Sequence, residues 1–115
     1  MSKIAMFSFK GEAMCFVHVL LNAVDMNDRG YDVKIIIEGA SVNLVKEFGM
    51  ESSQFHKLYA KVKQLGLVSA VCRACSVKMN VLEHIESQGL PISDEMSGHP
   101  AMSHYIDEGY QVLTF

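Results

Sequence analysis

The sequence predicts an α/β protein, a three-layer α/β/α sandwich with helices on both faces of a mostly parallel sheet of four to five strands. Short apolar segments typical of strands buried on both faces alternate along the chain with longer segments whose apolar residues recur at helical spacing. Glycine or proline separates most of these segments. Such alternation favours parallel strands joined by helices.

The chain opens with a predicted strand, a long helix and a second strand. Residues 3–9 form a short, mostly apolar run, as expected of a strand covered on both faces. Residues 12–28 repeat apolar side chains at helical spacing, and Gly30 follows as a helix stop. Residues 32–38 are rich in β-branched side chains, which favour a strand.

Two helices are expected before the chain returns to the sheet. Residues 40–48 predict a short helix that ends near Gly49. A longer helix begins after Ser52 or Ser53, either of which can cap it, and it places apolar residues on one face as far as Leu65.

A third buried strand leads directly into another helical segment. Residues 67–72 are mostly apolar and predict the strand, and a helix begins at Arg73 and extends to about residue 79. Asn80 tolerates the left-handed conformation. The helix therefore either breaks there, with a second helix over residues 81–88, or runs straight through.

The last part of the chain contains a polar loop, a helix and a final strand. A short strand or turn is expected near residues 91–92, in a segment that is otherwise polar and irregular up to residue 99. Pro100 suits the first turn of a helix over residues 100–108. Residues 111–115 predict the final strand. The order of the strands in the sheet does not follow from these patterns.

Composition limits the class of protein. With 115 residues, half of them hydrophobic, the chain predicts a single domain over residues 1–115. The net charge of -3 argues against nucleic acid as a partner, because nucleic-acid binding usually needs a basic surface. The chain has no apolar run long enough for a membrane span, so none is expected.

The cysteine content and the start of the chain favour a cytoplasmic location. The chain has only three cysteines, an odd and low number that does not indicate a fold held together by disulfides. The apolar run near the start is short and lacks a small-residue cleavage site, so a secretory signal is not expected. The eight methionines are expected to fill gaps in the core or at a subunit interface.

Cys72 is the main candidate for chemistry. Reactive groups gather at the carboxyl ends of parallel strands, and Cys72 ends an apolar strand just before a helix begins. The unpaired amides and the dipole of that helix are expected to stabilise a thiolate and lower the pKa of Cys72. Cys75 completes a C-x-x-C, a spacing that can bring two sulfurs within bonding distance. The alternative is that one or both cysteines are inert packing residues.

His99 is the candidate for an acid or a base beside Cys72. It lies in the polar loop before the last helix and can transfer protons near neutral pH if the loop carries it to Cys72. The alternative is a turn in which His99 is solvated. A structural zinc site is not expected, because four ligands are usual and the chain has no second C-x-x-C. Cys15, inside the first predicted helix, is expected to pack in the core.

The order of elements and the junction at Cys72 resemble the DsrE/DsrF-like family of small sulfur-relay proteins, which includes the TusD type. The resemblance covers nearly the whole chain: the opening strand and helix, the segment DVKIIIEGASVNLV, the junction VCRACSVKMNV and the closing VLTF. It implies a DsrEFH-like fold. In the sulfur-relay members, the cysteine at the strand end accepts a persulfide, and Cys72 matches it. This chain has Cys75 where many relatives have a small residue, and Met79-Asn80 where relatives often have Arg-Gly.

These observations predict a cytoplasmic sulfur carrier or sulfurtransferase-like protein with Cys72, Cys75 and His99 as its site residues. Its expected partners are a sulfur donor and a sulfur acceptor protein, and the chemistry requires no metal or organic cofactor. The resemblance implies a homo-oligomer, either a trimer or a hexamer. One alternative is a non-enzymatic oligomeric module that binds a small ligand or a metal at the same strand ends. Another is a dithiol redox protein that forms a reversible Cys72–Cys75 disulfide.

Overall fold

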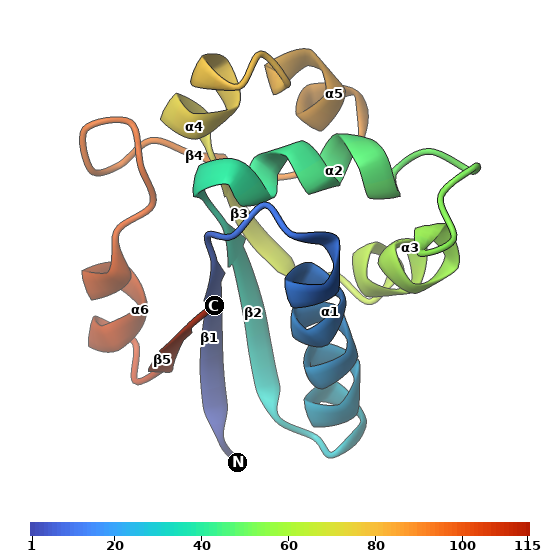
Figure 1. Cartoon of the computed structure of the whole chain (residues 1–115). Helices are drawn as coiled ribbons and strands as arrows, with labels where there is room; N and C mark the ends of the chain where they lie inside the picture. The colour runs from blue at the N-terminus through green and yellow to red at the C-terminus, as the bar shows by residue number, and fades with distance from the viewer.

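The computed structural model describes residues 1–115 and contains one sheet of five strands, in which every neighbouring pair is parallel. The strands lie in the order β4-β3-β2-β1-β5 (Figure 1). Their bounds are β1 Lys3–Ser8, β2 Asp32–Ile37, β3 Val68–Cys72, β4 Ile92–Ser93 and β5 Gln111–Thr114. The predicted α/β class with a largely parallel sheet is confirmed, and the sheet has the larger of the predicted numbers of strands.

Six α-helices connect the strands, and each lies inside a predicted helical segment. They are α1 Ala13–Asp28, α2 Val42–Phe48, α3 His56–Gln64, α4 Arg73–Lys78, α5 Leu82–Ser87 and α6 Met102–Asp107. A 3-10 turn, η1 Gly39–Ser41, precedes α2. Asn80 has a φ of 59° and separates α4 from α5, so the expectation of two helices holds and the straight helix is wrong. None of the helices combines the length and hydropathy that crossing a membrane requires.

One face of the sheet carries the main core. Alternate side chains of β1 and β2 point to this face, where Met6 and Ile35 are completely buried. Helices α1, α2 and α5 supply the facing side chains, among them Phe16, Phe48 and Ile85. Figure 1 shows α1, α2 and α3 together on this side of the strands. The cluster contains 21 buried residues, so this layer supplies most of the apolar burial.

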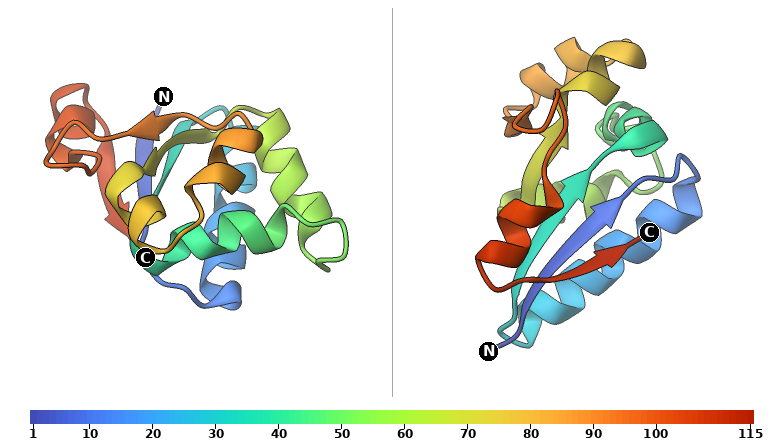
Figure 2. Two further views of the ribbon diagram at one scale, coloured as in Figure 1. Left: turned by 90° about the horizontal axis from the view of Figure 1, so that it is seen from above. Right: turned by 90° about the vertical axis from the view of Figure 1, so that its left-hand side faces the viewer.

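The opposite face has a thinner cover, made mainly by α6. Its cluster has six buried residues, and the rings of Phe7 from β1 and Tyr105 from α6 meet edge to face at 5.6 Å. Figure 2 shows α6 and α1 on opposite sides of the sheet. Connections between parallel strands are right-handed. From β1 the chain adds β2, β3 and β4 on one side, and it then returns past β1 to add β5 on the other side. Since the direction reverses while the connections stay right-handed, the last helix covers the other face of the sheet. This helix completes the predicted three layers.

Parallel strands bring their carboxyl ends to one edge of the sheet. There β1 ends at Ser8, β2 at Ile37 and β3 at Cys72, with α4 and α5 above them (Figure 1). The connection from β4 to α6, residues 94–101, starts at the same edge and crosses to the other side of the sheet. This crossing brings the polar loop to the carboxyl ends of the central strands.

Candidate functional site

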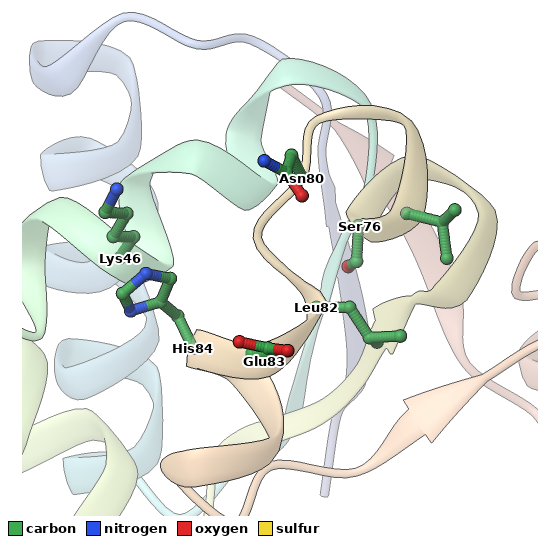
Figure 3. Close-up of a pocket in the computed structure, with 7 residues that line it drawn as sticks. Lys46, Ser76, Asn80, Leu82, Glu83 and His84 are labelled. Atoms are coloured by element: carbon green, nitrogen blue, oxygen red, sulfur yellow. The ribbon is translucent and has the colours of Figure 1, made fainter.

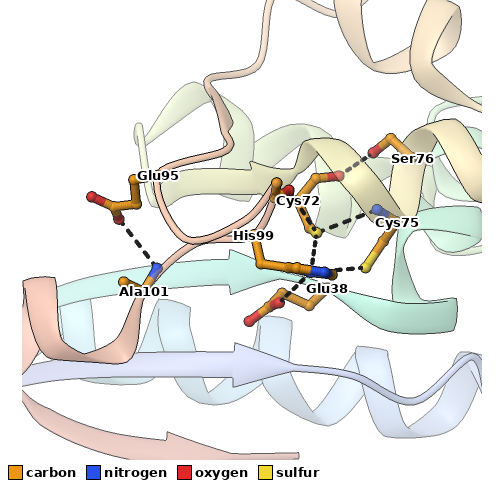
Figure 4. Close-up of polar contacts among 8 residues, drawn as sticks. Glu38, Cys72, Cys75, Ser76, Glu95, His99 and Ala101 are labelled. Atoms are coloured by element: carbon orange, nitrogen blue, oxygen red, sulfur yellow. Dashed lines mark hydrogen bonds and ion pairs between the residues drawn. The ribbon is translucent and has the colours of Figure 1, made fainter.

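Four side chains meet at the carboxyl edge of the sheet. Glu38 follows β2, Cys72 ends β3, Cys75 lies in the first turn of α4, and His99 comes from the connection between β4 and α6 (Figure 4). One sulfur, nitrogen or oxygen atom of each residue lies within 4.8 Å of the corresponding atoms of the others. We call these residues the edge cluster, and it joins three segments that are far apart in the sequence.

Cys72 is the N-cap residue of α4. Its backbone is extended (φ -64°, ψ 121°), and its Sγ accepts a hydrogen bond from the Cys75 amide at 3.3 Å. Ser76 Oγ donates to the Cys72 carbonyl at 2.6 Å and holds the same turn in place. The sulfur therefore lies where the sequence predicts it, at the start of a helix. The amide that it faces has no hydrogen-bond partner within the helix itself. Cys72 is completely buried.

The expected lowering of the Cys72 pKa is wrong. The pKa of Cys72 is raised to about 12, first by burial and then by the Cys75 side chain and the Glu38 charge, whereas the Cys75 amide lowers it. Helix α4 has only six residues, and one amide hydrogen bond does not offset the cost of removing a thiolate from water. The resting Cys72 is therefore a protonated thiol near neutral pH.

A tight turn presents His99 to the edge cluster. Met96 and His99 exchange two backbone hydrogen bonds, of 2.8 and 2.9 Å. Ser97 and Gly98 between them both have positive φ, 49° and 92°, as in a type I′ turn. The Ala74 amide donates to the Gly98 carbonyl at 2.9 Å, and a Cβ at position 98 would lie only 2.9 Å from the Ala74 Cβ. Glycine therefore allows this turn to pack directly on α4.

His99 contacts the other members of the cluster through one ring nitrogen. Its Nδ1 lies 3.1 Å from Cys72 Sγ and 3.8 Å from Cys75 Sγ. The same nitrogen lies 3.6 Å from Glu38 Oε1. The His99 side chain is 40% exposed, whereas Cys72 is completely buried. The loop forms the turn of the alternative, bent at Gly98 and with His99 half-exposed, and it also holds His99 against Cys72.

Sequence reasoning missed Glu38. Its side chain is 9% exposed, and the polar side chain that contacts it is His99. Burial raises the pKa of Glu38, and the charge and hydrogen bond of His99 partly offset this rise. Gly39 comes next, and a Cβ there would lie 2.9 Å from the Phe9 carbonyl oxygen, so the ends of β1 and β2 approach closely. The available signal was an acidic residue directly after a buried parallel strand, where functional groups gather.

Two surface hollows give access to the edge cluster, and His99 lines both. The first is lined by Gly39, Ala74, Cys75, Lys78, Met79 and His99. The second is lined by Phe9, Glu38, Met96, His99, Pro100, Met102 and Ser103. Cys75 is half-buried, whereas Cys72 lines neither hollow. A molecule that enters the first hollow therefore meets Cys75 and His99 before Cys72.

A separate hollow lies among α2, α4 and α5. It is lined by Lys46, Ser76, Val77, Asn80, Leu82, Glu83 and His84 (Figure 3). Lys46, Glu83 and His84 are exposed residues of helical surfaces, and no member of the edge cluster lines this hollow. The edge cluster therefore does not open into this hollow.

We expect iodoacetamide to modify Cys75 before Cys72 near neutral pH. Cys75 is half-buried and lines a hollow, whereas Cys72 is completely buried and its pKa is raised to about 12. Alkylation requires the thiolate and an open path to it. Peptide mass spectrometry after timed reaction measures the order, with the half-buried Cys15 of α1 as an internal reference. Faster modification of Cys72 than of Cys75 would contradict this arrangement.

Comparisons with known proteins agree with this fold. A family model described as the DsrE/DsrF-like family matches residues 6–115. The uncharacterized protein MJ0733 of Methanocaldococcus jannaschii is 33% identical over 97 residues, which cover 84% of this chain and 77% of that protein. An uncharacterized protein of Archaeoglobus fulgidus is 46% identical over 37 residues, or 32% of this chain and 61% of that protein. The solved structure of BT1422, a conserved protein of unknown function from Bacteroides thetaiotaomicron, has a TM-score of 0.69 at 20% identity and covers 96% of this chain and 94% of its own.

Proposed function

This chain belongs to the DsrE/DsrF-like family, and from that membership we propose that it accepts sulfur as a persulfide on Cys72 and passes it to a partner protein. The family is generally connected with sulfur relay. The observation that carries the proposal is the 3.1 Å separation between Cys72 Sγ and His99 Nδ1. A thiol within hydrogen-bond reach of an imidazole is an arrangement that activates a nucleophile.

His99 supplies the base that the buried thiol needs. The thiolate is the nucleophile in sulfur exchange, and Cys72 is protonated at rest. Neutral Nδ1 accepts the proton from Sγ as the attack begins, so the thiolate forms only beside the incoming sulfur. Glu38 Oε1, 3.6 Å from the same nitrogen, stabilises the imidazolium that results.

Sulfur loading balances without an added oxidant or reductant. Cys72 Sγ attacks the outer sulfur of a donor persulfide, R–S–SH. A new S–S bond forms on Cys72 as the donor S–S bond breaks, and the donor leaves as a thiolate that takes up the proton held by His99. The products are Cys72–S–SH and R–SH. In unloading, an acceptor thiolate attacks the outer sulfur of Cys72–S–SH, and Cys72 leaves as the thiolate and regains a proton.

Cys75 offers a second route for release. Its Sγ lies within 4.8 Å of Cys72 Sγ, so a small movement brings the Cys75 thiolate onto the inner sulfur of the persulfide. That attack forms a Cys72–Cys75 disulfide and expels hydrosulfide, and a dithiol reductant must then reduce the disulfide before the next cycle. The same proximity favours a dithiol redox role as the second candidate function.

Exposed methionines flank the way to the cluster. Met79 is 37% exposed in the first hollow and Met96 is 52% exposed in the second. Methionine adapts its shape to different surfaces, which suits a carrier that must receive sulfur from one protein and deliver it to another. The donor and acceptor proteins are therefore expected to dock over these two hollows.

The proposal predicts that the reduced protein gains one sulfur atom on Cys72 when it is incubated with inorganic polysulfide. Intact-mass and peptide mass spectrometry measure the gain and its position. Cys72→Ser should abolish the gain, because the substitution removes the attacking sulfur. Cys75→Ser should keep it and make the persulfide longer-lived, because internal release is blocked. Cys15→Ser is the matched control and should behave like the parent chain.

Two results would contradict this assignment. Retention of the added sulfur in Cys72→Ser would move the carrier to another cysteine. Formation of a Cys72–Cys75 disulfide under mild oxidation, with no stable sulfur gain even in Cys75→Ser, would favour the dithiol redox function instead.

A further inference from the structure

We propose that Glu38, Cys72, Cys75 and His99 form a four-ligand binding site for Zn²⁺. The edge cluster contains two sulfurs, one imidazole nitrogen and one carboxylate oxygen, all within 4.8 Å of one another. Zinc in proteins prefers four ligands of these types. The inference rests on the donor atoms and their geometry, and it does not depend on sulfur transfer.

The distances already approach those of a tetrahedral zinc site. Zinc lies about 2.3 Å from a thiolate sulfur and about 2.0–2.2 Å from nitrogen or oxygen, so neighbouring ligand atoms in a tetrahedron are about 3.3–3.8 Å apart. His99 Nδ1 lies 3.1 and 3.8 Å from the two sulfurs and 3.6 Å from Glu38 Oε1. Three edges of the tetrahedron are therefore close to their final length. The remaining distances between ligand atoms are at most 4.8 Å, so each has to shorten by little more than about 1 Å for the four atoms to surround an ion.

The chain holds these ligands in place before an ion binds. Cys72 and Cys75 have the C-x-x-C spacing of many zinc sites, with the Cys75 amide bonded to Cys72 Sγ at 3.3 Å. The Gly98 carbonyl accepts from the Ala74 amide of α4 at 2.9 Å, which ties the His99 turn to the helix that carries Cys75. Figure 4 shows the Glu38 and cysteine side chains converging on the His99 ring.

The buried carboxylate gives an independent reason for a cation. The side chain of Glu38 is 9% exposed, and its polar neighbour is the half-exposed His99 ring at 3.6 Å. No lysine or arginine forms an ion pair with it. A carboxylate removed from water is usually paired or bound to a metal. A divalent ion among the four side chains would supply the missing positive charge.

The donor set selects the kind of metal. Two thiolates and an imidazole favour Zn²⁺ over Mg²⁺ or Ca²⁺, which prefer oxygen ligands. Zinc and a persulfide compete for the same Cys72 sulfur. The metal-bound chain is therefore expected to resist both sulfur loading and alkylation.

Titration with Co²⁺ tests the site, because tetrahedral Co²⁺ bound to thiolates absorbs visibly and reports its ligands. We expect one Co²⁺ per reduced chain, a sulfur-to-metal charge-transfer band, and displacement by Zn²⁺. Glu38→Gln and His99→Asn should each weaken Zn²⁺ binding by about 10²-fold or more, since even the loss of a residue that only orients a ligand costs about 10–100-fold. Glu83→Gln and His84→Asn, at the exposed hollow of Figure 3, are the matched controls and should bind like the parent.

The proposal is overturned if the charge-transfer band is absent, or if either Glu38→Gln or His99→Asn binds Zn²⁺ as tightly as the parent chain. Alkylation of the parent chain gives a test that needs no variant: Zn²⁺ should protect Cys72 and Cys75 but not Cys15, and equal protection of all three overturns the site. Sulfur loading is measured separately with a chelator present. Failure of zinc binding and failure of sulfur transfer are thus distinguishable.

Discussion

Replacement of His99 by glutamine is expected to slow sulfur loading of Cys72 by about 10²- to 10⁴-fold, the usual contribution of a general base. His99 Nδ1 lies 3.1 Å from Cys72 Sγ, and the pKa of Cys72 is raised to about 12. Without the imidazole, the thiolate must form against the full cost of burial. The measurement is the rate at which persulfide appears on Cys72 after mixing with polysulfide in the presence of a chelator.

Two further measurements separate a role in proton transfer from a role in packing. His84→Gln, an exposed histidine outside the edge cluster, should load sulfur at the parent rate. His99→Ala should regain part of the lost rate when free imidazole is added, because a small base can occupy the space of the missing ring. A parent-like rate in His99→Gln, or no rescue of His99→Ala, would remove His99 from the proposed chemistry.

Replacement of Phe48 by alanine is expected to lower the free energy of unfolding by about 3–5 kcal/mol. Phe48 in α2 is completely buried, and its ring lies 5.3 Å from the Phe16 ring and 5.2 Å from the Phe55 ring. The substitution leaves a cavity among aromatic side chains that cannot all move to fill it. Urea denaturation followed by circular dichroism measures the loss, and thermal unfolding should show a fall on the order of 10 °C or more.

Ile106→Ala is the matched control for this core substitution. Ile106 lies in α6 and is 58% exposed, so its truncation should change the free energy of unfolding by less than about 0.5 kcal/mol. Equal effects of the two substitutions would contradict the placement of the main core between the sheet and α2.

Local patterns in the sequence were enough to determine the elements and the class of fold. The apolar run of residues 67–72 and the helix that follows identified the junction at Cys72. Asn80, which tolerates a positive φ, marked the boundary between α4 and α5. These features follow from backbone preferences and the spacing of apolar residues, which a short segment expresses without its neighbours.

The protonation state of Cys72 and the groups around it could not be derived from local patterns. The sequence placed Cys72 at the start of a helix, and the structure has its sulfur facing the Cys75 amide. The expected fall in its pKa was nevertheless wrong, because burial raises this pKa, and a local sequence pattern does not show how deeply the assembled fold buries a side chain. The expectation that zinc would lack ligands left out Glu38, because only the fold places this residue beside Cys72, Cys75 and His99.

The sequence by itself thus determined the strands, the helices and the cysteine at the end of β3, because each depends on residues that are neighbours along the chain. Only the tertiary structure decided which groups surround that cysteine. Glu38 reaches it because β2 and β3 are parallel neighbours, and His99 reaches it because the connection from β4 to α6 crosses the carboxyl edge of the sheet. Strand order and the path of a long connection depend on packing among the whole set of elements, and no local pattern encodes them.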